Sequence, residues 1–385
     1  MTAKELLSII QQSGKTVRRN SDDLEIIRKI TSHYENESKS VKNNLIYLKM
    51  KKNYDSLPTD YQYSNFYGII KDAFESLYSV ISNKDIIFLG NRIEHISMPL
   101  YGTASLDGYN AHIFTDDEPV IVFNDELLML TEKLVEIYTK FCWLVKIKKL
   151  SRKYAVLIVK NFIDVLYCFC NYKDAYNSIP LDWCEISNFD DLNSIEKIYD
   201  IDFEMETNFD DVEYKNFYYE LGLSAYMWIA SHEYAHLLLG HTKSENHFNH
   251  LELNNQDLQE YNFEIEKEYD ADLLGAILTM ESEQTLHLSN GIFFALKCME
   301  LSELRNTEHF VQTHPSTRLR MKRIFEYLEN DYRYYLGNYK NIDDVFSLMC
   351  KEYKKFVKHL KDNNLKFDGL FELQKYLYEQ YEVEL

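Results

Sequence analysis

Apolar residues recur at helical spacing along most of the chain. This period predicts helices within residues 1–57, at 62–83 and within 125–172. Beyond residue 214 the same pattern continues to the end of the chain. The protein is therefore expected to be mainly helical.

The pattern changes between residues 85 and 125, where short β-branched or aromatic runs appear. These runs are 86–90, 111–114 and 120–123, and Gly102, Gly108 and a turn at 116–119 separate them. Such runs bounded by turn residues predict strands. The expected fold class is α+β, with one small β-sheet beside the helices.

Composition excludes some classes of function. The net charge is −20 over 385 residues, which argues against binding to a phosphate backbone, so no nucleic acid is expected as a partner. The first residues lack the apolar core of a signal peptide. The most apolar run, 155–170, contains Lys160 and Asp164, which predicts a buried helix and no membrane span. A cytoplasmic protein is expected.

The segment 231–241 carries the pattern HExxH, formed by His232, Glu233 and His236. Its neighbours predict a helix that ends near Gly240. Histidines four positions apart lie on one face of a helix, so both imidazoles can bind the same ion. Glu233 can then take a proton from a water that the ion polarises. The alternative is a pair of surface histidines beside a glutamate.

A second helical segment, at 266–278, offers the acidic residues that such a site requires. A catalytic zinc needs a third protein ligand and an open fourth position. Glu268 can provide that ligand. Asp272, one turn later, can accept a hydrogen bond from the far nitrogen of a zinc-bound histidine. The alternative is a solvated acidic helix face.

His241 is an alternative third ligand. The arrangement HExxHxxGxxH would require Gly at position 239 and His at 242, but the chain has Leu239 and Thr242. We therefore place His241 at the helix end, where a cation interacts favourably with the helix dipole.

A third segment, 313–325, contains the pair His314-Pro315 before a predicted helix, with Arg318 one turn further on. A histidine or arginine near zinc can stabilise the oxyanion of a tetrahedral intermediate. Equally, Ser316 or Thr317 could cap the helix beside a histidine without catalytic role.

These elements together resemble the M48 group of gluzincin metallopeptidases, the Ste24/HtpX-like family. That family combines HExxH, a Glu-x-x-Ala-Asp motif, and a His-Pro pair followed by a helix with an arginine. In this chain the matching residues are 232–236, 268–272, and His314-Pro315 with Arg318. The resemblance implies a zincin-like fold with a β-sheet beside the HExxH helix, and one Zn²⁺ per chain.

Residues 108–128 resemble the family's substrate-binding strand and the helix start that follows it. The resemblance implies that Asn110 and Ala111 lie on an edge strand that holds the substrate as an added β-strand. The chain departs from the family because about a hundred residues separate this strand from HExxH. As a protein without membrane spans and with large added helices, it also resembles the Lit-like phage-exclusion peptidases, which attack a host translation factor.

We expect a helical N-terminal extension at 1–58, a metallopeptidase domain at 59–330 with a helical insertion at about 131–225, and a helical C-terminal extension at 331–385. The expected activity is zinc-dependent endopeptidase cleavage of a protein or peptide substrate, in a cytoplasmic protease regulated in stress or antiviral (phage) defence. Two alternatives stay open: a non-catalytic, zinc-stabilised binding scaffold, and a dormant protease that a regulatory partner protein activates.

Overall fold

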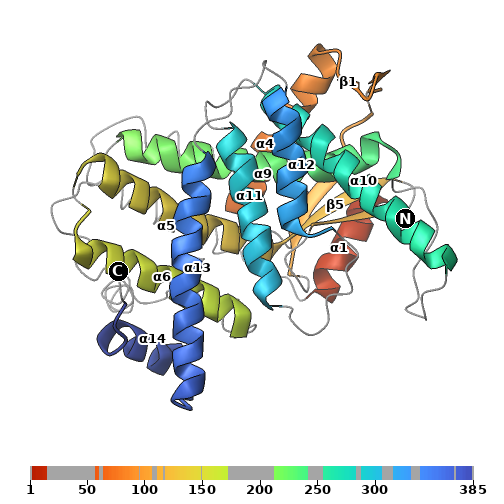
Figure 1. Ribbon diagram of the computed structural model, residues 1–385. Helices are drawn as coiled ribbons and strands as arrows, with labels where there is room; N and C mark the ends of the chain where they lie inside the picture. The colour runs from red at the N-terminus through yellow and green to blue at the C-terminus, as the bar shows by residue number, and fades with distance from the viewer. Residues whose placement is uncertain are drawn as a thin grey trace, which may run out of the picture.

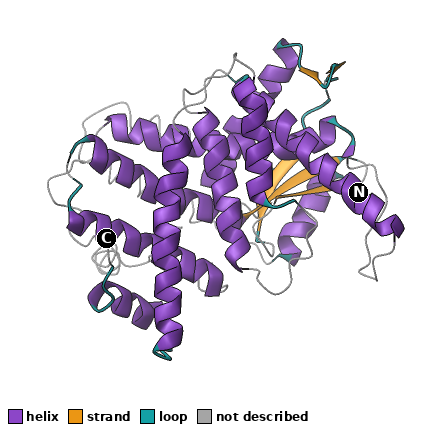
Figure 2. Ribbon diagram, in the orientation of Figure 1, coloured by secondary structure: helices purple, strands orange, loops and turns teal. Residues whose placement is uncertain are grey.

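The computed structural model is built mainly of helices, with two small β-sheets (Figures 1 and 2). This agrees with the expected α+β class. The described residues are 2–14, 57–59, 64–94, 96–105, 111–115, 118–148, 150–171, 212–241, 255–282, 288–305, 315–330, 339–367 and 370–383.

The helices largely follow the apolar periodicity of the sequence. Their bounds are α1 Ala3–Ser13, α4 Ser64–Asn83, α5 Asp125–Lys146, α6 Arg152–Asn171, α9 Val212–Leu238, α10 Asn255–Met280, α11 Leu288–Ser302, η2 Glu303–Arg305 (a 3₁₀ turn), α12 Thr317–Asn330, α13 Tyr339–Asp362 and α14 Leu370–Glu379. The predicted helical region 125–172 is two helices, α5 and α6. Lys148 lies between them with a φ of 56°, which ends helical geometry.

The larger sheet has the strand order β3-β5-β4. The strands are β3 Leu100–Ala104, β4 Ala111–Thr115 and β5 Pro119–Asn124. Strand β5 pairs parallel with β3 and antiparallel with β4. A separate hairpin consists of β1 Ile87–Phe88 and β2 Asn91–Arg92. In the described sheet, β4 is therefore an edge strand with β5 on one side.

Side chains of β5 alternate between two apolar clusters, as the period of a strand requires. Val120 and Val122 pack against α1, whereas Ile121 and Phe123 belong to the main core. Gln11 fixes α1 in place, because its side-chain amide donates to the Thr103 carbonyl at 2.7 Å. The sheet thus lies between α1 and the helical body.

Strand β3 is missing from the sequence prediction, which took Gly102 as a separator between strands. The structure places Gly102 inside β3, paired with Val122. A glycine weakens a strand signal because it brings no side chain to pack. Pairing with β5, which local sequence does not reveal, decides this segment instead.

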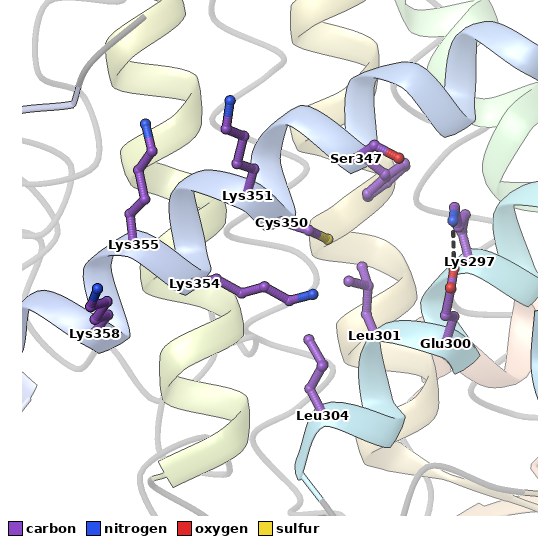
Figure 3. Close-up of a pocket in the computed structure, with 11 residues that line it drawn as sticks. Lys297, Glu300, Leu301, Leu304, Ser347, Cys350, Lys351, Lys354, Lys355 and Lys358 are labelled. Carbon is purple, nitrogen blue, oxygen red and sulfur yellow. Dashed lines mark hydrogen bonds and ion pairs between the residues drawn. The ribbon is translucent and has the colours of Figure 1, made fainter. Parts of the chain in front are cut away.

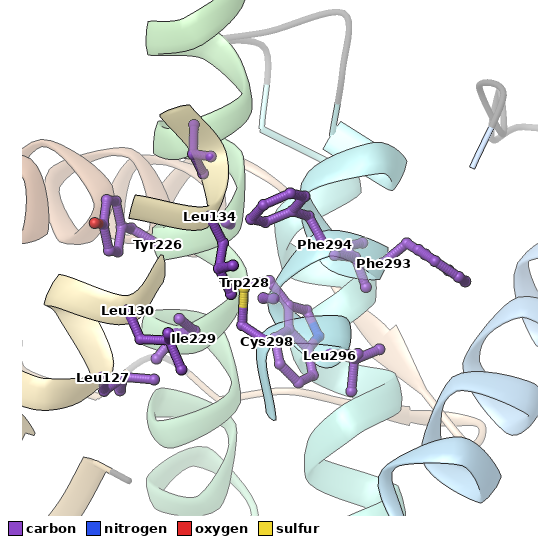
Figure 4. Packing of buried hydrophobic residues seen from close by; sticks show 14 of the residues in the cluster. Leu127, Leu130, Leu134, Tyr226, Trp228, Ile229, Phe293, Phe294, Leu296 and Cys298 are labelled. Atoms are coloured by element: carbon purple, nitrogen blue, oxygen red, sulfur yellow. The ribbon is translucent and has the colours of Figure 1, made fainter. Parts of the chain in front are cut away.

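The long helix α9 is the centre of the protein. Its residues from 221 to 232 are all buried, because α4, α5, α10 and α11 surround it. Figure 4 shows side chains of α5, α9 and α11 meeting around Trp228 and Phe294. A helix that is apolar on all sides must be covered in this way. The HExxH pattern therefore starts inside the core.

Helix α10 packs antiparallel to α9 along a seam of small and polar residues. Thr279 meets Ser231 at 3.0 Å between their hydroxyl oxygens. At Gly275 the helices come so close that an added Cβ would lie 2.9 Å from the backbone nitrogen of His232. Only glycine permits this approach. The close contact sets the position of α10 directly beside the HExxH helix.

Helix α6 is long and apolar enough to cross a membrane by length and composition, and 50% of its most apolar stretch is buried inside the protein. It packs against α5, α13 and α14. The side chain of Gln374 on α14 donates to Asp164 at 3.0 Å. This packing agrees with the buried helix that the sequence predicts.

Replacing Gly275 by alanine should separate α10 from α9. The added methyl group meets backbone atoms, which cannot rotate away, so we expect the free energy of unfolding to fall by about 1–3 kcal/mol. The matched control is Gly222→Ala on α9, where the nearest atom is a Val135 methyl at 3.9 Å. That variant should gain roughly 0.5–1 kcal/mol from better helix propensity. Urea denaturation measures both, and equal stabilities would contradict the close-packing argument.

Candidate metal centre

Three side chains that can bind a metal converge where α9 and α10 meet. The ligand atoms of His232, His236 and Glu268 all lie within 4.8 Å of one another. The two Nε2 atoms of the histidines are 3.3 Å apart. Helix α9 presents both imidazoles on one face, and α10 presents the carboxylate opposite them. The structure therefore brings together the three residues that the sequence predicts as ligands.

The spacing of these atoms fits a zinc ion. The Glu268 oxygens lie 3.6 Å from His232 Nε2 and 3.4 Å from His236 Nε2. Ligands held about 2.0–2.1 Å from zinc in tetrahedral geometry are separated by roughly 3.3–3.4 Å. Two imidazoles and one carboxylate are also a donor set of catalytic zinc sites, which keep the fourth position open. The residues present thus fit the ion.

Asp272 contacts His232 on the side of the imidazole that faces away from Glu268, at the position that the sequence predicts for a hydrogen-bond acceptor. Its Oδ1 lies 3.0 Å from His232 Nδ1, so the imidazole can donate there and keep Nε2 free to bind a metal. Burial alone would raise the pKa of Asp272, but Arg320 and His232 hold it well below its usual range. The carboxylate is therefore ionised.

Arg320 on α12 is the partner that sequence reasoning missed. Its guanidinium donates from Nε and Nη2 to the two oxygens of Asp272, at 2.8 and 2.7 Å. The same group lies 5.9 Å from the centre of the Trp228 ring. A bidentate pair of this kind fixes both orientation and charge. Arg320, Asp272 and His232 thus form one buried chain of contacts that ends at the metal-ligand group.

Arg318, the arginine that the sequence analysis selected, lies elsewhere. Its side chain is exposed and lines a cavity with Lys322 and Asp343. Two positions on a helix differ by about 200° around the axis, so Arg318 and Arg320 face opposite ways. The buried stripe of α12 gives the signal that could have found Arg320: Thr317, Arg320, Met321, Ile324, Phe325 and Leu328.

Two other predicted residues, His314 and Asn110, lie outside the described residues. The residue after His314, Pro315, is buried just before α12. Ala111 is the first residue of the edge strand β4, and β4 contacts α9. The expected substrate strand is therefore next to the helix that carries HExxH.

His241 is close to the metal-ligand group, but behind it. Its Nδ1 lies 3.1 Å from Nδ1 of His236, the nitrogen that faces away from His232 and Glu268. Gly240, with a φ of 69°, turns the chain after α9 and directs His241 back toward the helix. His241 can therefore accept the hydrogen bond that fixes the tautomer of His236. The structure supports this role more than the role of a third ligand.

Burial shifts the pKa values of the neighbouring groups in ways that suit a metal centre. Burial, together with the positive charge of His232, lowers the pKa of His236 to about 3, so this imidazole is neutral, as a ligand must be. Burial raises the pKa of Glu233 to about 7. A general base works best when its pKa lies near the working pH.

The described charges around the group leave a deficit of positive charge. Glu233, Glu268 and Asp272 act electrostatically on one another, and Arg320 is the cation among them. When both imidazoles are neutral, as they must be to bind a metal, the carboxylates of Glu268 and Asp272 share one guanidinium, and Glu233 adds negative charge as it ionises. Buried charge is costly unless it is paired. A divalent cation would neutralise the group.

Residues 200–338 match the family model described as Peptidase U49. The matched range includes α9, α10, α11 and α12, and so all residues of the metal-ligand group. The match indicates a peptidase. Comparison with curated proteins and with solved structures found no match.

Removing His241 should weaken metal binding without unfolding the protein. In the variant His241→Ala, His236 loses the acceptor for its Nδ1 proton, and losses of this kind cost about 10–100-fold in metal affinity. Competition with a chromophoric chelator measures the zinc dissociation constant. The variant His241→Asn keeps an acceptor and should retain more of the affinity. Wild-type affinity in the alanine variant would contradict this role.

Removing the Arg320 guanidinium should destabilise the protein. Arg320→Met leaves Asp272 buried without its cation, and breaking a buried pair in this way costs about 3–5 kcal/mol. Arg318→Met, two residues away on the exposed face of α12, should change stability by at most about 0.5 kcal/mol. Urea denaturation of the metal-free variants makes the comparison. A small, equal effect of both would contradict the assignment of Arg320.

Proposed function

We propose that this chain is a zinc-dependent endopeptidase of the gluzincin type, with a zincin-like arrangement of sheet and HExxH helix. The observation that carries the proposal is the convergence of His232, His236 and Glu268 at spacings that fit a tetrahedral ion. The peptidase family match over the same part of the chain supports it.

In this proposal His232, His236 and Glu268 would hold the zinc ion. The bound ion would supply Lewis acidity, which lowers the pKa of water and polarises the scissile carbonyl. Asp272 keeps the imidazole of His232 oriented through the 3.0 Å contact to Nδ1. Arg320 in turn keeps Asp272 ionised and in place.

Glu233 is the general base. It follows His232 on α9, and it is partly buried beside the ligands. Its carboxylate would take a proton from the attacking water and pass it to the nitrogen of the leaving amine. An intact base favours catalysis over a zinc-stabilised scaffold, because a site that only stabilises the fold needs no proton acceptor. His314, next to Pro315, is the proposed hydrogen-bond donor to the oxyanion.

The edge strand β4 would bind the substrate. It has β5 on one side within the described sheet, and it contacts α9. An extended peptide can pair with a free strand edge through main-chain hydrogen bonds, which bind without regard to side-chain identity. Ala111, at the start of β4, would then lie along the substrate backbone. This arrangement favours a protein or peptide substrate over a small molecule.

The variant Glu233→Gln should keep zinc but lose cleavage, because the amide cannot accept the proton. His236→Ala should release the metal, because one ligand is lost. Metal analysis of the purified proteins and cleavage of a peptide library, before and after zinc removal by a chelator, test both. Normal cleavage by Glu233→Gln would refute the assignment of the base. One zinc per chain with no cleavage by the wild type would contradict the endopeptidase proposal.

A further inference from the structure

Two adjoining cavities lie along α11, and none of the metal-ligand group lines them. The larger has a volume of about 590 Å³ and lies between α11 and α13. The smaller, about 370 Å³, extends toward α12. Lys297, Glu300 and Ser347 line both, so the two cavities adjoin. The larger cavity, here named the basic groove, is shown in Figure 3.

The floor of the basic groove is apolar. Leu301 on α11 and Leu304 on η2 line it opposite Phe346 and Cys350 on α13. Leu301 and Phe346 are buried beneath it, whereas Leu304 and Cys350 are partly exposed. These positions recur every three or four residues, so they form matching stripes on the two sides of the groove. Such a floor favours an apolar side chain of a ligand, and it offers few donors to an isolated phosphate.

Lysines form the rim. Those on α13 are Lys351, Lys354, Lys355 and Lys358, and Figure 3 shows Lys354 extending over the groove toward Leu301 and Leu304. Lys355 pairs with Glu352 at 2.8 Å. Lys351, Lys354 and Lys358 are exposed, and no described carboxylate lies within ion-pair distance of them.

This concentration of positive charge contrasts with the net charge of −20 of the whole chain. Glu300 is the acidic residue that the groove lining contains, and it pairs with Lys297. Lys351, Lys354 and Lys358 therefore leave the described groove with an excess of positive charge. The rim therefore selects carboxylates in a ligand through charge complementarity. The apolar floor selects aliphatic or aromatic groups in that same ligand.

We propose that the basic groove binds an acidic amphipathic helix of a partner protein. From Phe346 to Lys358 the groove follows α13 for roughly 18 Å, which is about three helical turns. A helix laid in such a groove places apolar residues on the floor and carboxylates along the lysine rim. The proposal stands on the groove alone and does not require the peptidase activity.

Fluorescence anisotropy with a synthetic helical peptide tests the proposal. The labelled probe carries leucines at helical spacing on one face and glutamates on both flanks, and Glu233→Gln protein prevents its cleavage. Reversing two rim charges, Lys354→Glu with Lys358→Glu, should weaken binding at least about tenfold, because like charges then face each other. The control pair, Lys4→Glu with Lys366→Glu, changes the net charge equally on exposed sites outside the groove and should leave binding nearly unchanged.

A third variant, Leu304→Ser, tests the apolar floor. It should weaken binding because it removes apolar contact with the probe, and this loss should not depend on the salt concentration. Thermal melts establish that each variant is folded. No binding by the parent protein, or equal losses in the two charge pairs, would overturn the proposal. Unchanged binding in Leu304→Ser together with full displacement by inorganic pyrophosphate would also overturn it, because the groove would then be a plain anion site.

Discussion

The close contact between α10 and α9 at Gly275 determines the rest of the site. It lets the two backbones approach until no Cβ could fit between them. Asp272 lies one turn and Glu268 two turns before Gly275 on the same face of α10, so the approach that buries Gly275 also brings these carboxylates against the HExxH histidines. A wider seam would leave both carboxylates in solvent. The close packing of α10 against α9 in the core thus determines where His232, His236 and Glu268 meet.

Burying these carboxylates costs free energy unless positive charge is placed beside them. Arg320 pairs with Asp272 through two hydrogen bonds, and this fixes one carboxylate permanently. A divalent ion held by Glu268 and the two imidazoles would add positive charge to the same group. Unlike a second arginine, an ion leaves a coordination position open for water or substrate. The proposed ion would therefore offset the cost of burying these acids and provide the open position that catalysis needs.

The convergence of His232, His236 and Glu268 could be predicted from local motifs, because each motif depends on spacing within a single helix. The HExxH residues lie on one face of a helix because of their spacing, and so do Glu268 and Asp272. Gly240 indicated where the HExxH helix ends. The residues that sequence reasoning missed depend on contacts between elements. The close approach at Gly275 depends on the backbone of α9, Arg318 was chosen by its distance from His314, and β3 depends on pairing with β5. The buried stripe of α12 was present in the sequence and would have corrected the second of these.

Helix α12 connects the metal-ligand group to the cavities on its other side. Arg320 points from α12 to Asp272, whereas Arg318 and Lys322 line the smaller cavity, which adjoins the basic groove. A helix is stiff on the scale of two turns, so its two faces move together. The basic groove itself is lined by α11, η2 and α13, so α12 meets the smaller cavity on one face and the pair that positions His232 on the other.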